Sequence, residues 1–266
     1  MIPGINFTYC RHFIRHYLSA TRIDVLHSPF VFNLYNSCIK RQPTNHAFND
    51  IELLRKRLKA DCTVLLQKDF GAGSSLFSAK KRSVRELVYL HAKQARLQQI
   101  FYYLIRKFKY TRIVELGTSL GLTTAYLSKA TGEAGSVLSV EGADEIATAA
   151  QNNLNRLGLT NARILTGTFD NMLPQALAEL GKVDFAYVDG NHQYQPTLNY
   201  FHQLLPYLHN NSMLIFDDIY WSKGMLKAWT EIKNHPDVTV TVDLFYVGLV
   251  FFRREQVKEH FRLRVF

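Results

Sequence analysis

A short apolar run that leads into a glycine-containing turn most constrains how this chain can fold. Residues 113–121 read Ile-Val-Glu-Leu-Gly-Thr-Ser-Leu-Gly, and residues 122–130 continue with a helical pattern. A strand that enters a tight turn and then a helix is the first βα unit of a nucleotide-binding α/β fold. Such a turn uses glycine because its backbone adopts conformations that a Cβ forbids and because a ligand approaches it closely. The pattern therefore predicts a ligand site at this turn.

Downstream of the turn, predicted strands and helices alternate almost without interruption. Strands that alternate with helices of about 10–15 residues imply a parallel sheet that is covered on both faces. The last two β-rich runs are separated by almost nothing and are expected to pair antiparallel as a hairpin. We therefore predict an α/β fold with a doubly wound, mostly parallel, seven-stranded sheet and an antiparallel C-terminal hairpin, preceded by a helical N-terminal segment. The later strands are expected at residues 136–140, 163–166, 183–188, 213–216, 238–244 and 246–253, and the helices between them at 143–157, 170–180, 194–208 and 222–233.

Two classes of cofactor compete for such a fold. A nicotinamide enzyme would carry three glycines in the turn, whereas Ser119 replaces the middle one here. A pyrophosphate would also be repelled by Glu115, whose carboxylate suits a ligand with an ammonium or sulfonium group. At this point residues 110–254 resemble the class I S-adenosylmethionine-dependent methyltransferases, whose seventh strand is antiparallel. S-adenosyl-L-methionine is therefore the expected cofactor.

The resemblance also implies roles for individual residues. The glycines of the first motif would pass under the methionine part of the cofactor, the acid after the second strand would accept hydrogen bonds from the ribose hydroxyls, and the segment after the third strand would flank the adenine. From the residues alone, an ordinary tight turn, a solvated loop acid and a core phenylalanine remain the respective alternatives. The implied cofactor-binding residues are Glu115, Gly117, Ser119, Gly121, Glu141, Thr168, Phe169 and Asp170.

Three aspartates lie at the ends of two consecutive predicted strands. Asp189 follows the strand at 183–188, and Asp217 and Asp218 follow the strand at 213–216. Neighbouring strands lie about 4.8 Å apart, so these carboxylates repel one another unless a proton, a basic side chain or a cation lies between them. Oxygen ligands suit Mg²⁺, Mn²⁺ or Ca²⁺. The sequence therefore predicts Asp189, Asp217 and Asp218 as metal ligands, although Asp218 could instead cap the next helix.

The segment Asp189-Gly-Asn-His192 resembles the metal-dependent O-methyltransferases of the catechol, caffeoyl-CoA and antibiotic-sugar types. It departs from the catechol branch, which has Asn where this chain has Asp218 and Lys where it has His192. A divalent ion would lower the pKa of a bound substrate hydroxyl, and His192, together with Asp189, is predicted to remove the proton. An Asx-turn histidine is the alternative for His192. Tyr220 and Trp221 follow the acidic pair and are expected to line the acceptor pocket.

The N-terminal segment carries the positive charge of the chain. Residues 1–110 hold 19 Lys and Arg against 6 Asp and Glu, whereas residues 111–266 hold 13 against 16. A basic face attracts nucleic acid, acidic lipid headgroups or an anionic substrate, and solvated helix faces are the bland alternative. Helices are predicted at residues 30–39, 51–58 and 84–108, the last opened by a Ser83–Glu86 capping box. We expect a basic helical segment or lid at 1–109 and the cofactor-binding domain at 110–266, with a glycine turn or substrate flap at 69–74.

Together these observations predict a cytoplasmic S-adenosylmethionine-dependent O-methyltransferase, assisted by a divalent metal. Its acceptor would be a hydroxyl of a small molecule, a sugar or a lipid-linked compound, and an anionic acceptor is one option. An RNA-directed methyltransferase and a protein that binds the cofactor without transfer are the alternatives. All three cysteines precede residue 63, which argues against cytosine C5 chemistry and fits a reducing compartment. No membrane span is expected, and assembly into a homo-oligomer stays open.

Overall fold

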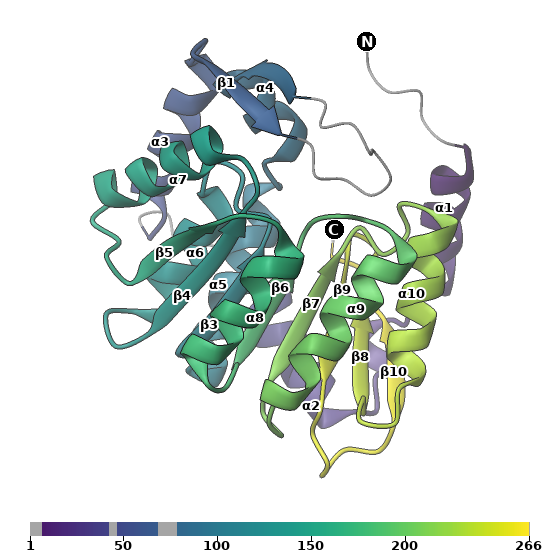
Figure 1. Cartoon of the computed structure of the whole chain (residues 1–266). Helices are drawn as coiled ribbons and strands as arrows, with labels where there is room; N and C mark the ends of the chain where they lie inside the picture. Colours follow the sequence, from purple (N-terminus) through teal and green to yellow (C-terminus); the bar gives the residue numbers. More distant parts are fainter. Residues whose placement is uncertain (1–6, 43–46, 69–78, 266) are drawn as a thin grey trace. The chain divides into compact units, whose positions relative to one another are not determined.

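The computed structural model describes residues 7–42, 47–68 and 79–265 (Figure 1). They divide into two compact units, which are described separately. The central unit comprises residues 41–185, and the terminal unit comprises residues 1–40 and 186–266. The predicted boundary between residues 109 and 110 stays a prediction, and the predicted turn at 69–74 lies outside the described residues.

The central unit contains the first half of the predicted βα alternation. Three parallel strands lie in the order β3-β4-β5, with Glu115 of β3 opposite Ser139 of β4 and Glu141 of β4 opposite Thr166 of β5. β3 and β4 are almost wholly buried, as expected of a sheet with helices on its faces. The elements are β3 (Arg112–Leu116), α6 (Leu122–Thr131), β4 (Ser136–Glu141), α7 (Asp144–Arg156), β5 (Ala162–Thr166) and α8 (Phe169–Leu180).

The earlier part of the central unit is helical, with one two-stranded sheet. β1 and β2 pair antiparallel, and the predicted capping box opens α4, where Ser83 N donates to Glu86 at 2.7 Å. A part-buried hydrogen bond joins two of the helices, since Tyr126 of α6 donates to Glu52 of α3 at 2.8 Å. The elements are α3 (Asn49–Ala60), β1 (Val64–Lys68), β2 (Ala79–Ser83), α4 (Val84–His91) and α5 (Ala95–Phe108).

The prediction of one helix over residues 84–108 was wrong. The backbone is extended at Ala92 and at Gln94, and α4 and α5 are separate helices. The two helices are buried differently, since α4 buries Val84, Leu87 and Val88, whereas α5 is buried all round over its residues 97–101. No glycine or proline marks the break, so local composition gave no sign of it.

The terminal unit contains the other strands of the fold, in the order β10-β8-β9-β7-β6. β8 and β9 form the predicted antiparallel hairpin, and β9 also pairs antiparallel with β7. β10 pairs parallel with β8 and is a strand that the sequence did not predict, because its four residues are partly exposed and contain no apolar run. The elements are β6 (Phe185–Val188), α9 (Tyr194–Leu204), η3 (Leu205–Tyr207), β7 (Met213–Asp217), α10 (Lys223–Asn234), β8 (Val240–Asp243), β9 (Val247–Phe251) and β10 (Glu259–Arg262). The predicted α/β fold class, mostly parallel with an antiparallel C-terminal pair, is confirmed.

The first helices of the chain belong to the terminal unit as well. α2 begins one residue before the predicted start, with Ser28 accepting a hydrogen bond from Val31 N at 3.4 Å, and it continues into a π-helical turn. The ring of Phe30 packs edge-on against Phe251 of β9, with 5.1 Å between the centroids. The elements are α1 (Phe7–Ser19), η1 (Ile23–Val25), α2 (Pro29–Leu34) and η2 (Tyr35–Ile39). Among the described residues, no helix combines the length and the apolar character that a membrane crossing requires.

Gly248 of β9 offers a test of packing in the terminal unit. A Cβ at this position would lie 2.5 Å from Cη2 of Trp229, a fully buried side chain of α10. We expect Gly248→Ala to lower the free energy of unfolding by about 1–3 kcal/mol, because the ring has no room to yield. Urea unfolding followed by circular dichroism measures the change.

Gly224 provides the matched control for this substitution. A Cβ there would meet Cβ of Tyr194 at 3.5 Å, an ordinary contact. Gly224→Ala should leave stability unchanged or raise it by about 0.4–1 kcal/mol, through the lower entropy of the unfolded chain. Equal losses in the two variants would contradict the packing argument.

Candidate cofactor and metal sites

The glycine turn of the central unit has the backbone geometry that its sequence predicted. Gly117 and Gly121 have φ values of 101° and 80°, and Gly121 caps α6. The N–H groups of Gly117 and Thr118 both donate to the carbonyl of Val140 at 3.0 and 3.2 Å, which ties the turn to the end of β4. Ser119 adopts a φ of 48°, a left-handed conformation that is uncommon for a residue other than glycine. The turn is therefore held in an unusual shape by specific contacts.

Glu141 at the end of β4 is one of those contacts. Its Oε2 accepts a hydrogen bond from Ser119 N at 2.9 Å, and its Oε1 accepts one from Ala143 N at 3.0 Å. Burial raises the pKa of Glu141 above its usual value, although the N–H bonds from Ala143 and Ser119 oppose this rise. The acid predicted to bind a ribose thus also fixes the turn that precedes α6.

Glu115 of β3 is fully buried. The hydroxyls of Thr124 and Ser139 both donate to its Oε2, at 2.5 and 2.6 Å. Sequence reasoning missed these two partners. The strand register places Ser139 opposite Glu115, and Thr124 lies on the helix that follows the turn. The hydroxyl residues at these two positions were the only sign in the sequence that Glu115 has hydrogen-bond donors.

The segment after β5 starts α8. Thr168 is the N-cap residue, and its carbonyl accepts from the N–H groups of Asn171 and Met172. Phe169 is half-buried and Asp170 is exposed. Gly167 N donates to the carbonyl of Glu141 at 2.9 Å, which connects this segment to the end of β4. The predicted cofactor-binding residues of the central unit therefore follow the carboxyl ends of three neighbouring parallel strands.

The terminal unit brings the predicted acidic residues together around His192. Asp189, His192 and Asp217 each offer a ligand atom, and these atoms lie within 4.8 Å of one another. His192 Nε2 lies 3.6 Å from Asp189 Oδ1 and 3.8 Å from Asp218 Oδ2. Asp217 is buried, whereas the other three residues are half-buried. This group of four residues is called the acidic cluster below.

Tyr187 of β6 is a partner of the acidic cluster that sequence reasoning missed. Its hydroxyl lies 3.1 Å from Asp189 Oδ2 and 3.2 Å from Asp217 Oδ1, and it can donate to either carboxylate. Burial raises the pKa of Tyr187 well above its usual range, and the charges of Asp189 and Asp217 add to the rise. The phenol therefore stays protonated between the two acids. It stands in an apolar run that reads as core, so the sequence carried no separate signal for it.

Two residues of the acidic cluster loops have left-handed backbones. Asn191 and Asp218 have φ values of 49° and 51°, which Asn and Asp tolerate better than most residues. Asn191 donates to the hydroxyl of Tyr200 at 3.1 Å, while its own amide oxygen is buried and makes no hydrogen bond to a described residue. The cap of α10 is Ser222, which accepts from Met225 N at 3.1 Å, so the capping role considered for Asp218 was wrong.

The two aromatic residues after the acidic pair differ in their surroundings. Tyr220 is buried and donates to Asp243 Oδ2 at 2.5 Å. Trp221 is 57% exposed, and its ring meets the edge of Tyr9 of α1 with 6.4 Å between the centroids. Burial would raise the pKa of Asp243, but hydrogen bonds from His16 and Tyr220 outweigh it and hold that pKa below its usual value. That Tyr220 and Trp221 line an acceptor pocket stays a prediction.

Comparison with known sequences identifies a domain over this region. Residues 114–219 match the family model described as a methyltransferase domain. A curated catechol O-methyltransferase of Niastella koreensis is 30% identical over 109 residues, which are 40% of this chain and 48% of that protein. The match therefore spans about half the length of that relative.

Solved structures with the same fold cover most of the chain. An O-methyltransferase from Bacillus cereus in complex with SAH matches with a TM-score of 0.55 and 15% identity, over 86% of this chain and 100% of that one. The O-methyltransferase TomG from Streptomyces achromogenes, in complex with SAM, matches with a TM-score of 0.54 and 16% identity, over 84% and 96% of the two chains. At such identities the likeness shows the fold alone. Residues 114–219 therefore match a methyltransferase domain, and this chain has the fold of the class I S-adenosylmethionine-dependent methyltransferases, as the sequence resemblance implied.

Proposed function

We propose that this protein is an S-adenosylmethionine-dependent O-methyltransferase that uses a divalent metal ion to methylate a hydroxyl of a small-molecule acceptor. The observation that carries the proposal is the acidic cluster of Asp189, His192, Asp217 and Asp218 in a chain that also has the glycine turn and Glu141. The acidic cluster supplies groups for an acceptor hydroxyl, and the glycine turn with Glu141 supplies groups for the cofactor. The relatives named above are O-methyltransferases, which supports the same reaction class.

Cofactor binding is assigned to the central unit. Glu141 offers carboxylate oxygens for the ribose hydroxyls, and the turn at residues 117–121, whose glycines have positive φ values, is assigned to the methionine part. Thr168, Phe169 and Asp170 are assigned to the adenine, next to the end of β4. Glu115 is a buried carboxyl group next to the turn, and its ionised form would suit a cationic cofactor.

The donor set of the acidic cluster fits a divalent cation. The carboxylates of Asp189 and Asp217 flank the phenol of Tyr187, which is neutral and therefore does not balance a negative charge on them. Asn191 adds a buried amide oxygen that has no hydrogen bond to a described residue, and such an oxygen is also a ligand for hard cations. Asp189, Asp217 and Asp218 would hold Mg²⁺ or Mn²⁺. The ion, when bound, supplies a positive charge that orients the acceptor hydroxyl and lowers its pKa.

His192 is assigned the role of general base. Its Nε2 would take the proton of the acceptor hydroxyl, and the resulting imidazolium would be stabilised by Asp189 and Asp218, whose oxygens lie 3.6 and 3.8 Å away. The cofactor, when bound by the residues of the glycine turn and Glu141, would supply a sulfonium methyl group for transfer to the deprotonated acceptor oxygen, with S-adenosylhomocysteine as the leaving group. Tyr187 keeps the two aspartates in place.

The acceptor is proposed as a small molecule with a free hydroxyl, with sugar or lipid-linked compounds as variants of that class. An RNA-directed methyltransferase and a binding protein without transfer activity are not favoured, because the relatives are O-methyltransferases by name.

Glu141→Gln tests the assignment of the ribose contact. An uncharged amide then replaces the carboxylate that would accept hydrogen bonds from the ribose hydroxyls. We expect S-adenosylmethionine affinity to fall by about 10- to 100-fold in calorimetric titration. Glu145→Gln is the matched control, since this acid lies four residues later in the first turn of α7 and accepts from Leu66 N. Equal affinity in the wild type and Glu141→Gln would remove Glu141 from the cofactor site.

The pH dependence of binding follows from the raised pKa of Glu141. The carboxylate binds hydroxyl donors, and its protonated form does so less well. Cofactor affinity should therefore be constant above that pKa and fall as the pH is lowered through it. Titrations at a series of acidic pH values should show this loss in the wild type and not in Glu141→Gln.

Asp189→Asn and Asp217→Asn test the metal site. We expect each to weaken the binding of Mn²⁺ or Mg²⁺ by at least about tenfold, because a ligand charge is lost. Asp237→Asn, at an acid that is 70% exposed on the same unit, is the control. Calorimetry with the metal alone gives the readout, and circular dichroism verifies that each variant is folded.

Activity measurements with a chelator distinguish the contribution of the metal ion from that of His192. Transfer that persists in excess chelator but falls by about 10²–10⁴-fold in His192→Ala would mean metal-free transfer with His192 as base. Metal binding that is equal in wild type, Asp189→Asn and Asp217→Asn would overturn the proposed metal site.

A further inference from the structure

Helix α1 presents an apolar stripe to solvent. Leu18 is 75% exposed, Ile14 is 58% exposed and Tyr17 is 46% exposed. Cys10, Ile14 and Leu18 follow one another at intervals of four residues, so they lie on one face of the helix. An open hollow of about 490 Å³ lies against this face. A soluble surface seldom gathers large aliphatic side chains in this way without a partner.

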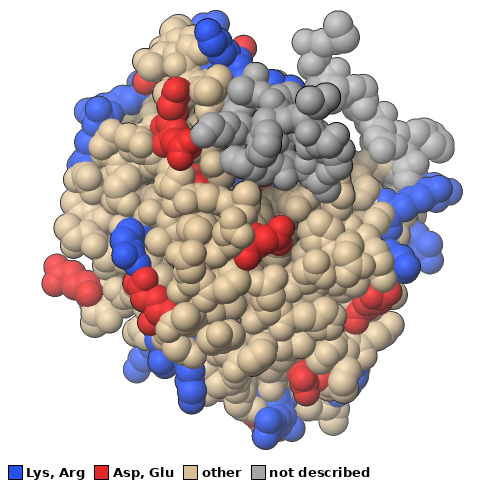
Figure 2. Space-filling view, viewed as in Figure 1, with Lys and Arg blue, Asp and Glu red and all other residues tan. Residues whose placement is uncertain are grey.

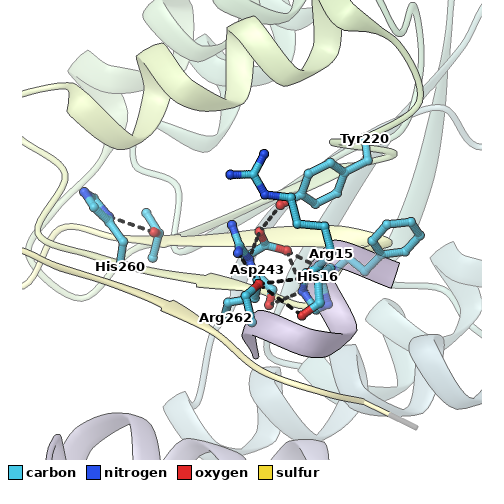
Figure 3. Close-up of polar contacts among 9 residues, drawn as sticks. Arg15, His16, Tyr220, Asp243, His260 and Arg262 are labelled. Atoms are coloured by element: carbon cyan, nitrogen blue, oxygen red, sulfur yellow. Dashed lines mark hydrogen bonds and ion pairs between the residues drawn. The ribbon is translucent and has the colours of Figure 1, made fainter. Parts of the chain in front are cut away.

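The inner face of α1 is firmly attached, so the outward direction of the stripe is fixed. His16 Nε2 lies 3.0 Å from Asp243 Oδ1, and Arg262 and Tyr220 converge on the same carboxylate (Figure 3). After the helix ends, Thr21 N donates to the carbonyl of Arg262 at 2.8 Å. Helix α1 is thus an integral part of the terminal unit, and it exposes Ile14 and Leu18 while it is docked.

Arginines border the stripe on both sides. Arg11 and Arg15 are exposed and stand one position after Cys10 and Ile14 on the helix. On the other side, the guanidinium of Arg264 lies 3.7 Å from the centroid of the Tyr17 ring and donates to the Tyr17 carbonyl. The sequence has no acidic residue before Asp24. In Figure 2, Lys and Arg side chains gather at the right-hand edge, where Figure 1 shows α1 and α10.

We propose that this face of α1 docks on an anionic lipid surface. Ile14 and Leu18 would enter the boundary between headgroups and acyl chains, and the flanking arginines would remain at the level of the phosphates. A helix with an aliphatic centre and a basic rim is the pattern of helices that lie in the interface plane. The inference is independent of the proposed catalytic activity, because none of these side chains belongs to the cofactor or acidic groups.

Two other occupants suit the face less well. A second copy of this chain in a two-fold interface would bring the same basic rim against itself, so that Arg11 and Arg15 would meet like charges. A nucleic acid would pair with the arginines, but its phosphates would leave Ile14 and Leu18 exposed to water. The lipid surface satisfies both the apolar stripe and the charge.

Flotation with vesicles tests the proposal. The full-length protein should float with vesicles of phosphatidylcholine that contain phosphatidylglycerol, should not float with phosphatidylcholine alone, and should be released by salt. Leu18→Asp should lower the partition coefficient by about tenfold or more, because a leucine that would enter the lipid is replaced by a charged side chain. The double variant Arg11→Glu with Arg15→Glu should also lower it by about tenfold or more.

Controls of the same chemistry are available in the central unit. Tyr89 is 82% exposed on α4, and Lys56 is exposed on α3. Tyr89→Asp and Lys56→Glu should leave the partition coefficient within about twofold of the wild type. Thermal unfolding of every variant distinguishes lost docking from lost folding, and the outward side chains of α1 should be replaceable without unfolding.

Four outcomes would overturn the proposal. They are no flotation with anionic vesicles, equal flotation with neutral vesicles, loss of flotation to the same degree in the controls, and a dimer in sedimentation velocity that Leu18→Asp dissociates. RNA binding that depends on Arg11 and Arg15 but not on Leu18, in the absence of flotation, would assign the face to nucleic acid instead.

Discussion

Carboxylates at the ends of buried strands need hydrogen-bond donors, and the local structure of both units depends on how this need is met. A charge in such a position has lost much of its water and must find donors nearby. Glu115 takes two hydroxyls, Glu141 takes the backbone of the turn, and Asp189 and Asp217 share the phenol of Tyr187. Each solution also fixes a loop, so the groups proposed to bind ligands are the groups that shape the backbone around them.

Much of the fold could be predicted because the signals were local. The alternation of strands and helices, the glycine turn and the Ser83–Glu86 capping box each depend on a few adjacent residues. The break between α4 and α5 and the strand β10 could not be predicted, since both result from tertiary pairing. β10 forms because β8 offers an open edge, and its own residues have no strong preference for a strand.

The candidate sites show the same division. The acids were predicted because strand ends can be located from the sequence, and the structure brings Asp189, His192 and Asp217 together. The hydrogen-bond partners of these acids were not predicted, because Thr124, Ser139 and Tyr187 look like ordinary helix or core residues until the strand register is known. The roles of the site residues remain predictions that binding measurements must test, whereas the fold does not depend on them.

The attachment of α1 has a consequence for the order in which the chain is completed. His16 bonds to the backbone of Asp243, 227 positions later, and Ser19 bonds to Arg262, 243 positions later. The central unit, by contrast, is one continuous stretch of chain. During synthesis on the ribosome, α1 leaves the exit tunnel before the central unit, whereas Asp243 and Arg262 emerge 227 and 243 residues after the side chains that they hold. A nascent chain therefore carries α1 undocked until the strands that hold it have been made.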